Sequence, residues 1–185
     1  MTEKELKTAK DLIFYSYADL GMAHYAVQNK LLKYDKNSYI IRAKLLKGLL
    51  NGTMNIRSIF DDEKIKLKTG HICNYCGSNK NLALEHIFPK KYGGKDDADN
   101  LILVCRYCNS SKGKKDLIEW MYSKNIFLPL MVIRRYLKLI HIYLIENSLI
   151  DKEKEYLEKI ELPFKIKSLP IKYPDLTTLK ITIND

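Results

Sequence analysis

The chain has 185 residues and a net charge of +10 at neutral pH, with 46% hydrophobic and 29% charged residues. This composition is typical of a soluble globular protein, and the basic excess suits a polyanionic partner. The longest apolar stretch, residues 126–133, is far shorter than the roughly 20 residues that span a bilayer, which excludes a membrane-spanning helix.

The first third of the chain is predicted to be helical. Apolar side chains recur at helical spacing over residues 3–32, which indicates one or two helices with a break expected at Gly21. Asn37 and Ser38 are typical of a helix N-terminus, so a further helix is expected from them through Leu50.

Short elements are predicted before the first cysteine. Residues 56–60 indicate a short helix, and the alternation over residues 64–68 indicates a strand with a basic face. His71 is expected to pack near the site or to meet phosphate, because the cysteines that follow it suffice for a metal.

All four cysteines occur as two Cys-x2-Cys pairs: Cys73, Cys76, Cys105 and Cys108. Each pair places two thiolates on a tight turn, and two pairs complete the tetrahedral sulfur shell that Zn²⁺ favours. Two disulfides would require an oxidising compartment, and Met-Thr-Glu-Lys-Glu is no signal peptide, which favours zinc and a cytoplasmic location. Four sulfur ligands leave no open coordination position, so this zinc is predicted to be structural.

The segment between the cysteine pairs predicts two paired strands, leading into Glu85-His86 and into Cys105, with a turn-rich loop over residues 93–97. After Cys108 the apolar positions follow helical spacing, so a helix is expected over about residues 110–123. Three polar residues are expected at the edge where strand and helix meet: Glu85, His86 and Asn109.

The order of short motifs in this stretch is specific. Glu-His-Ile-x-Pro begins at residue 85, Gly-Gly at 93, Asp-Asn-Leu at 99 and Cys-x2-Cys-Asn-x2-Lys-Gly at 105. Together these motifs resemble the HNH endonuclease family over about residues 71–122. The resemblance implies an α+β chain, mostly helical, with a central ββα-metal module clamped by the four-cysteine zinc site. It also implies a DNA endonuclease that leaves 5′-phosphate and 3′-hydroxyl ends.

The resemblance also implies roles for individual residues. His86 would be the general base, Glu85 and Asn109 would bind a catalytic Mg²⁺ or Mn²⁺, and Asn100 would brace the loop or orient the histidine. The residue types agree, because hard cations prefer oxygen ligands and imidazole titrates near neutrality. The family more often has Asp at the position of Glu85.

Five lysines flank this predicted site: Lys90, Lys91, Lys112, Lys114 and Lys115. The last three are expected in the first turn of a helix, where cations oppose the helix dipole, which favours contact with DNA phosphates over a merely solvated surface. Residues 151–185 carry seven basic and seven acidic side chains, so DNA contact is expected to involve the first 150 residues more than the tail.

The remainder is predicted to be helical and then extended. Residues 129–147 form an amphipathic pattern with Arg134, Arg135 and Lys138 off the apolar stripe, so this helix packs on the module or on a second subunit in a homodimer. A charged helix is expected over residues 151–160 and an edge strand over 179–183.

We therefore expect a helical region over residues 1–61, the nuclease module over 62–123, and a helical region with an extended tail over 124–185. The favoured function is a restriction or phage-defence nuclease. The alternatives are a homing or mobile-element nuclease and a zinc module that binds nucleic acid without cleaving it.

Overall fold

The computed structural model describes residues 6–56 and 70–184, so the elements predicted over residues 56–60 and 64–68 lie almost entirely outside the described residues. The α-helices are α1 (Ala9–Gln28), α2 (Lys36–Leu50), α4 (Arg106–Lys112), α5 (Leu117–Ser123), α6 (Leu130–Glu146) and α7 (Lys154–Leu157). The strands are β1 (Leu82–His86) and β2 (Leu101–Cys105), and short 3-10 turns are η2 (Lys90–Tyr92), η3 (Ile166–Ser168) and η4 (Leu176–Thr178). None of the described helices is long and apolar enough to cross a membrane.

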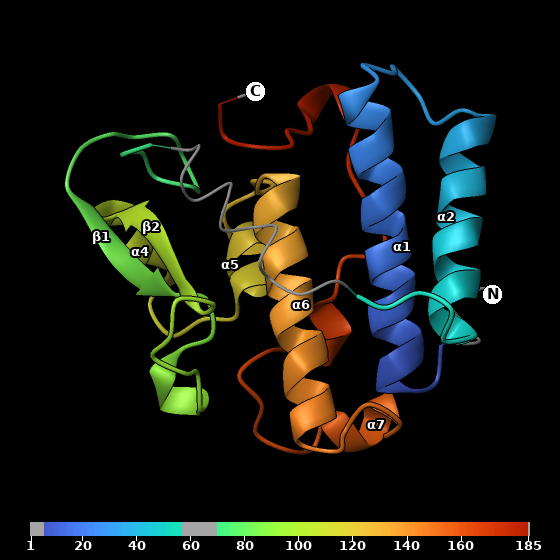
Figure 1. Cartoon of the computed structure of the whole chain (residues 1–185). Helices are drawn as coiled ribbons and strands as arrows, with labels where there is room; N and C mark the ends of the chain where they lie inside the picture. The colour runs from blue at the N-terminus through green and yellow to red at the C-terminus, as the bar shows by residue number, and fades with distance from the viewer. Residues whose placement is uncertain (1–5, 57–69, 185) are drawn as a thin grey trace.

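The long helices stand side by side, with α1 between α2 and α6, and the β1–β2 hairpin and α4 lie beyond α6 (Figure 1). One continuous hydrophobic core includes residues of the long helices, the hairpin, α5 and the C-terminal tail. The mixed α+β fold with a small two-stranded sheet confirms the predicted fold class.

Helix α1 runs without a break through Gly21, contrary to the sequence prediction. A Cβ atom at this position would lie 2.3 Å from Leu45 Cδ1 of α2, so the glycine is where the two helices pack closely. The same pair of helices is joined by a partly buried ion pair between Asp19 and Arg42. Close packing, rather than a helix end, therefore accounts for the glycine.

Helix α6 confirms the predicted amphipathic helix, but two of its cations are buried. Arg135 is 3% exposed and Lys138 is fully buried, although both lie off the predicted apolar stripe. Arg135 Nε donates to the carbonyl oxygen of Asp99 at 2.8 Å, and its Nη2 bonds the carbonyl of Ala98. Helix α6 therefore packs on the module in this chain and fastens the loop that precedes β2.

The tail differs from the sequence prediction in two places. The helix expected over residues 151–160 is reduced to the single turn of α7, and the strand expected over residues 179–183 does not form. Instead, the carbonyl oxygens of Lys180 and Ile181 accept hydrogen bonds from Leu130 N (2.8 Å) and Met131 N (3.1 Å). Pro129 provides no side-chain cap for α6, so the tail supplies the acceptors that the first turn of this helix needs.

The single helix expected over residues 110–123 is also wrong, because the chain forms two helices there. Helix α4 begins immediately after Cys105 and ends before Gly113, whose φ of +52° interrupts the helical path. Helix α5 then begins after Asp116, whose carboxylate accepts hydrogen bonds from the first-turn amides of α5. Lys112 consequently lies in the last turn of α4, where the helix dipole favours a cation instead of opposing it.

Candidate active site and zinc centre

The hairpin sets the geometry of the candidate site, and its strands match the predicted pair. The strands β1 and β2 are antiparallel, with Leu82 opposite Cys105 and His86 opposite Leu101. At about 3.3 Å per residue, the four residue steps between these pairs separate the two ends by about 13 Å. The cysteines therefore gather at one end of the hairpin and the histidine lies at the other.

The four cysteine side chains converge as predicted. Their Sγ atoms all lie within 4.8 Å of one another, and Cys76 Sγ is 3.7 Å from Cys105 Sγ. Tetrahedral zinc with Zn–S bonds of about 2.3 Å requires sulfur atoms about 3.8 Å apart, and the thiols are free rather than paired in disulfides. The residues fit a structural Zn²⁺, and the exposed His71 is not among the described residues that make up this group.

The first cysteine turn is also fastened directly to the hairpin. Asn74 donates from its backbone N (3.0 Å) and its side-chain Nδ2 (2.8 Å) to the carbonyl oxygen of Leu103 on β2. The neighbouring Tyr75 is buried, with its ring 5.1 Å from the Trp120 ring of α5. The first cysteine turn is therefore fastened to the hairpin and packs against α5.

Glu85 and His86 are neighbours at the end of β1, where Glu85 points toward α4 and His86 points toward the loop that follows the strand. Glu85 is buried, and its Oε1 atom lies 2.8 Å from the ammonium of Lys112 on α4. The same ammonium directs a hydrogen bond of 3.2 Å to the carbonyl oxygen of His86. Burial raises the pKa of the Glu85 carboxyl above its ordinary value, and Lys112 offsets part of this increase.

Besides the ion pair with Lys112, the buried Tyr75 hydroxyl acts on the Glu85 carboxyl and lowers its pKa, but neither Glu85 oxygen forms a hydrogen bond of normal geometry with any described residue. A buried carboxylate in this state fits a bound cation, because buried polar atoms normally have partners. Among the described His, Cys, Asp and Glu side chains, only the cysteines form a group sufficient to hold an ion. A cation at Glu85 would therefore need the Asn109 amide, water and substrate oxygens to complete its shell.

Asn109 lies on α4, three residues before Lys112, so helical spacing places both on one side of the helix. Its side chain is half-buried and forms no hydrogen bond with any described residue. The amide oxygen is therefore free to act as a ligand on the side of α4 that meets Glu85.

His86 has a partner, Asp96, that was not among the predicted site residues. Its Nε2 atom lies 2.7 Å from Asp96 Oδ1, and Asp96 Oδ2 accepts a hydrogen bond of 2.6 Å from the ammonium of Lys90. These bonds from Lys90 and His86 hold the pKa of the Asp96 carboxyl below its ordinary value. The ionised carboxylate accepts a hydrogen bond from Nε2–H, and in that tautomer of the neutral imidazole Nδ1 carries no proton and can take one from water. The sequence signal for this partner was the presence of an acidic residue, Asp96, in the glycine-containing loop.

Asn100 braces the loop between the strands. Its Oδ1 accepts a hydrogen bond from Phe88 N at 2.7 Å, and its Nδ2 donates to the carbonyl oxygens of Phe88 (2.9 Å) and Lys95 (2.8 Å). A Cβ atom on Gly94 would lie 2.0 Å from the Phe88 carbonyl oxygen, so only glycine allows the loop to close this tightly. The loop bearing Asp96 is therefore held in one conformation beside His86.

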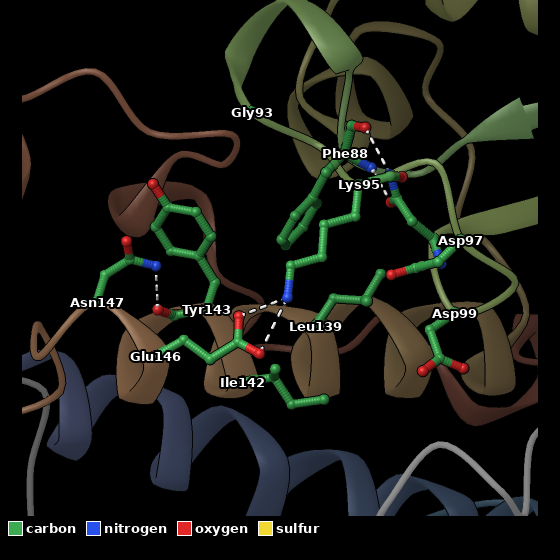
Figure 2. A pocket seen from close by; sticks show the side chains of 11 residues that line it. Phe88, Gly93, Lys95, Asp97, Asp99, Leu139, Ile142, Tyr143, Glu146 and Asn147 are labelled. Atoms are coloured by element: carbon green, nitrogen blue, oxygen red, sulfur yellow. Dashed lines mark hydrogen bonds and ion pairs between the residues drawn. The ribbon is translucent and has the colours of Figure 1, made fainter.

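On the side facing α6, this loop lines a pocket of about 430 Å³ (Figure 2). Lys95 extends from the loop across the pocket and forms an ion pair with Glu146 at 2.8 Å. Phe88, Leu139 and Tyr143 supply apolar surface around it. The pocket thus lies between the loop of the candidate site and helix α6.

The five lysines predicted to contact nucleic acid have different environments in the structure. Lys112 is 1% exposed, and its ammonium is paired with Glu85 rather than open to solvent, so its contact with phosphate stays a prediction. Lys90 is exposed but bound to Asp96, and Lys91 lies over the Tyr92 ring at 5.1 Å. Lys114 and Lys115 are exposed in the connector between α4 and α5.

The fold and the site define a class of small nuclease-like modules, in which a strand pair and a short helix are held by cysteines and present a histidine and a carboxylate. Residues 73–115 match the model of the HNH endonuclease family, so this chain carries an HNH endonuclease domain. The CRISPR-associated endonuclease Cas9 of Corynebacterium diphtheriae is 36% identical over an alignment of 58 residues that covers 29% of this chain and 5% of that protein. No solved structure matches the chain.

Proposed function

We propose that this protein is a metal-dependent DNA endonuclease that uses His86 as its general base. The observation that carries the proposal is the bond between His86 Nε2 and the Asp96 carboxylate at 2.7 Å, within a domain of the HNH family. That bond orients the ring and directs the basic Nδ1 atom away from the carboxylate. A base that takes a proton from water must be oriented in this way.

The other site residues would bind the metal ion and hold the loop in place. Glu85 and Asn109 would hold a divalent ion through a carboxylate and an amide oxygen, with Lys112 keeping the buried carboxylate ionised. A bound Mg²⁺ or Mn²⁺ would supply positive charge to the scissile phosphate and its leaving oxygen. Asn100 keeps the loop closed, so that Asp96 stays beside His86. The products would carry 5′-phosphate and 3′-hydroxyl ends.

The biological setting that we propose is restriction or phage defence. Its support is that α1, α2, α6 and the tail share one core with the module, which gives the domain a helical surface of its own for substrate recognition. Cleavage of unmodified phage DNA, with sparing of DNA from a protected host, would support this setting. Equal cleavage of both would count against it.

The deciding experiment incubates purified wild type and His86→Ala with plasmid DNA, phage DNA and RNA, in Mg²⁺, in Mn²⁺ and in chelator. Wild type should cut DNA only with a divalent ion, and sequencing of the ends should recover 5′-phosphates. Glu85→Ala leaves the buried Lys112 unpaired, so its native fold is first checked by circular dichroism. Folded Glu85→Ala should regain part of its activity at high Mn²⁺, whereas His86→Ala should not, because only the former change weakens metal binding. Binding without cleavage by wild type would favour the alternative of a non-catalytic zinc module.

A further inference from the structure

A second groove lies next to the candidate site, and its two walls come from distant parts of the chain. Residues 110–116 and Tyr92 form one wall, and residues 161–165 of the tail form the other. The groove has a volume of about 630 Å³. Lys112 lines it and lies 2.8 Å from Glu85 Oε1, so the groove adjoins the proposed ligand of the catalytic ion.

The tail wall is firmly attached to the module. Phe164 is 1% exposed, and its ring centroid lies 5.7 Å from those of both Phe88 and Tyr143. The next residue, Lys165, donates its backbone N–H to Asp116 Oδ2 at 3.2 Å. Asp116 also bonds the hydroxyl of Tyr136 on α6, so one buried carboxylate joins α5, α6 and the tail.

The charged side chains of the groove suit a phosphodiester backbone. Three exposed lysines line it, and none forms an ion pair within residues 6–56 and 70–184: Lys114, Lys115 and Lys165. Glu119 and Glu161 also line the groove, so its net charge is modest and binding would depend on where each lysine is placed. The backbone anchor on Asp116 fixes the base of the Lys165 side chain, which lowers the entropic cost of using it.

We propose that residues 161–165 form the second wall of the nucleic-acid groove and that the ammonium of Lys165 contacts a backbone phosphate of the substrate. This inference rests on the proposed function, because the bound strand would be the one that is cleaved. It also assigns a DNA contact to the tail, where the balanced charge predicted less contact than on the first 150 residues. The contact is independent of sequence, since a phosphate carries no base information.

The test compares Lys165→Gln with Lys167→Gln, each measured for binding of a labelled DNA duplex in the His86→Ala background. Lys167 is exposed in the same tail but does not line the groove, so it is a matched control for loss of one charge. Each phosphate contact contributes about 0.9 to the slope of log affinity against log salt. Between about 50 and 200 mM salt, the affinity advantage of the parent over Lys165→Gln should shrink about 3.5-fold. Lys167→Gln should keep the parental slope, and Lys165→Arg should restore it.

Equal slopes for Lys165→Gln and its parent, or an equal loss in Lys167→Gln, would overturn the assignment. Melting temperatures should not change, because the bond to Asp116 uses the backbone N–H that glutamine retains. Wild type that binds DNA through Lys165 without cutting it would refute the proposed function and leave the groove assignment intact. Absence of DNA binding by every variant would refute both.

Discussion

Glu85 and Lys112 form an ion pair in which both side chains are withdrawn from solvent, with exposed fractions of 4% and 0% and a distance of 2.8 Å. A buried charge is costly, and removing one member of such a pair leaves the other unbalanced. Lys112 therefore stabilises the ionised form of the carboxylate at the position where we propose a metal ligand.

We expect Lys112→Met to lower the free energy of unfolding by about 3–5 kcal/mol at about pH 8, because it leaves the Glu85 charge without a counterion. The double variant Glu85→Gln/Lys112→Met removes both charges and should recover most of the loss. Urea unfolding followed by circular dichroism measures both values. A double variant as unstable as Lys112→Met alone would show that lost packing, rather than unpaired charge, is the cause.

The loss of stability in Lys112→Met should also depend on pH. Burial raises the pKa of Glu85 above its ordinary value, and the positive charge of Lys112 lowers it. Loss of Lys112 should therefore raise the pKa of Glu85 further. A carboxyl with a raised folded pKa binds more protons in the folded state, so the free energy of unfolding increases as pH falls from the folded to the unfolded pKa. The deficit of Lys112→Met relative to wild type should therefore shrink with acidification. A deficit that stays constant from about pH 8 to about pH 5 would contradict this origin.

Local patterns predicted part of this site and long-range contacts decided the rest. The cysteine spacing and the alternation of the strands depend on neighbours in sequence, and both predictions were confirmed. The burial of Lys112 was missed because α4 begins at Arg106, before the predicted start, which turns residue 112 toward Glu85. The bond from His86 to Asp96 was missed because it crosses a loop whose path the sequence does not specify.

The buried cations of α6 illustrate the same limit. Periodicity identified the apolar stripe correctly, but the acceptors for Arg135 are backbone carbonyls of residues 98 and 99, which lie 37 and 36 positions earlier in the chain. The tail likewise contained a strand-like alternation, yet its carbonyls cap α6 instead of pairing with another strand. Such roles depend on which segments meet in space, and spacing within one segment does not determine this.

Zinc should contribute directly to folding. We expect about one zinc per chain by elemental analysis, and Cys73→Ser or Cys105→Ser should lose the metal and become poorly soluble, since structural zinc supplies roughly 10 kcal/mol or more in small domains. Ser78→Ala changes a residue in the same turn that supplies no sulfur ligand and should keep the metal. Freshly purified wild type without zinc would contradict the assignment.

Asn100→Ala should destabilise the loop, because it leaves Phe88 N and the carbonyls of Phe88 and Lys95 without their partner. We expect a loss of about 3 kcal/mol in the free energy of unfolding, the scale for buried polar groups that lose their hydrogen bonds. Hydrogen exchange should show faster exchange of the Phe88 amide. Asn100→Asp keeps the acceptor for that amide, so it should protect Phe88 better than Asn100→Ala does; equal exchange in both variants would exclude this role.

Asp96 should act on cleavage only through His86. Asp96→Ala removes the acceptor at 2.7 Å from Nε2 and leaves the ring free to rotate, so we expect kcat to fall about 10-fold. His86→Ala removes the base itself and should lower kcat by about 10²-fold or more. Both changes leave Lys165 intact, and Asp96→Ala frees the Lys90 ammonium without removing its charge, so neither change should raise the Kd for DNA above the wild-type value.

The matched control is Asp99→Asn, which removes the same charge from the same loop at a carboxylate that has no hydrogen bond among the described residues. It should retain wild-type kcat. In the double variant Asp96→Ala/His86→Ala the loss should equal that of His86→Ala alone, because orientation matters only while the base is present. Additive losses in the double variant, or an equal loss of kcat in Asp99→Asn, would mean that Asp96 acts only through its negative charge. His86 would then need another partner to fix its tautomer.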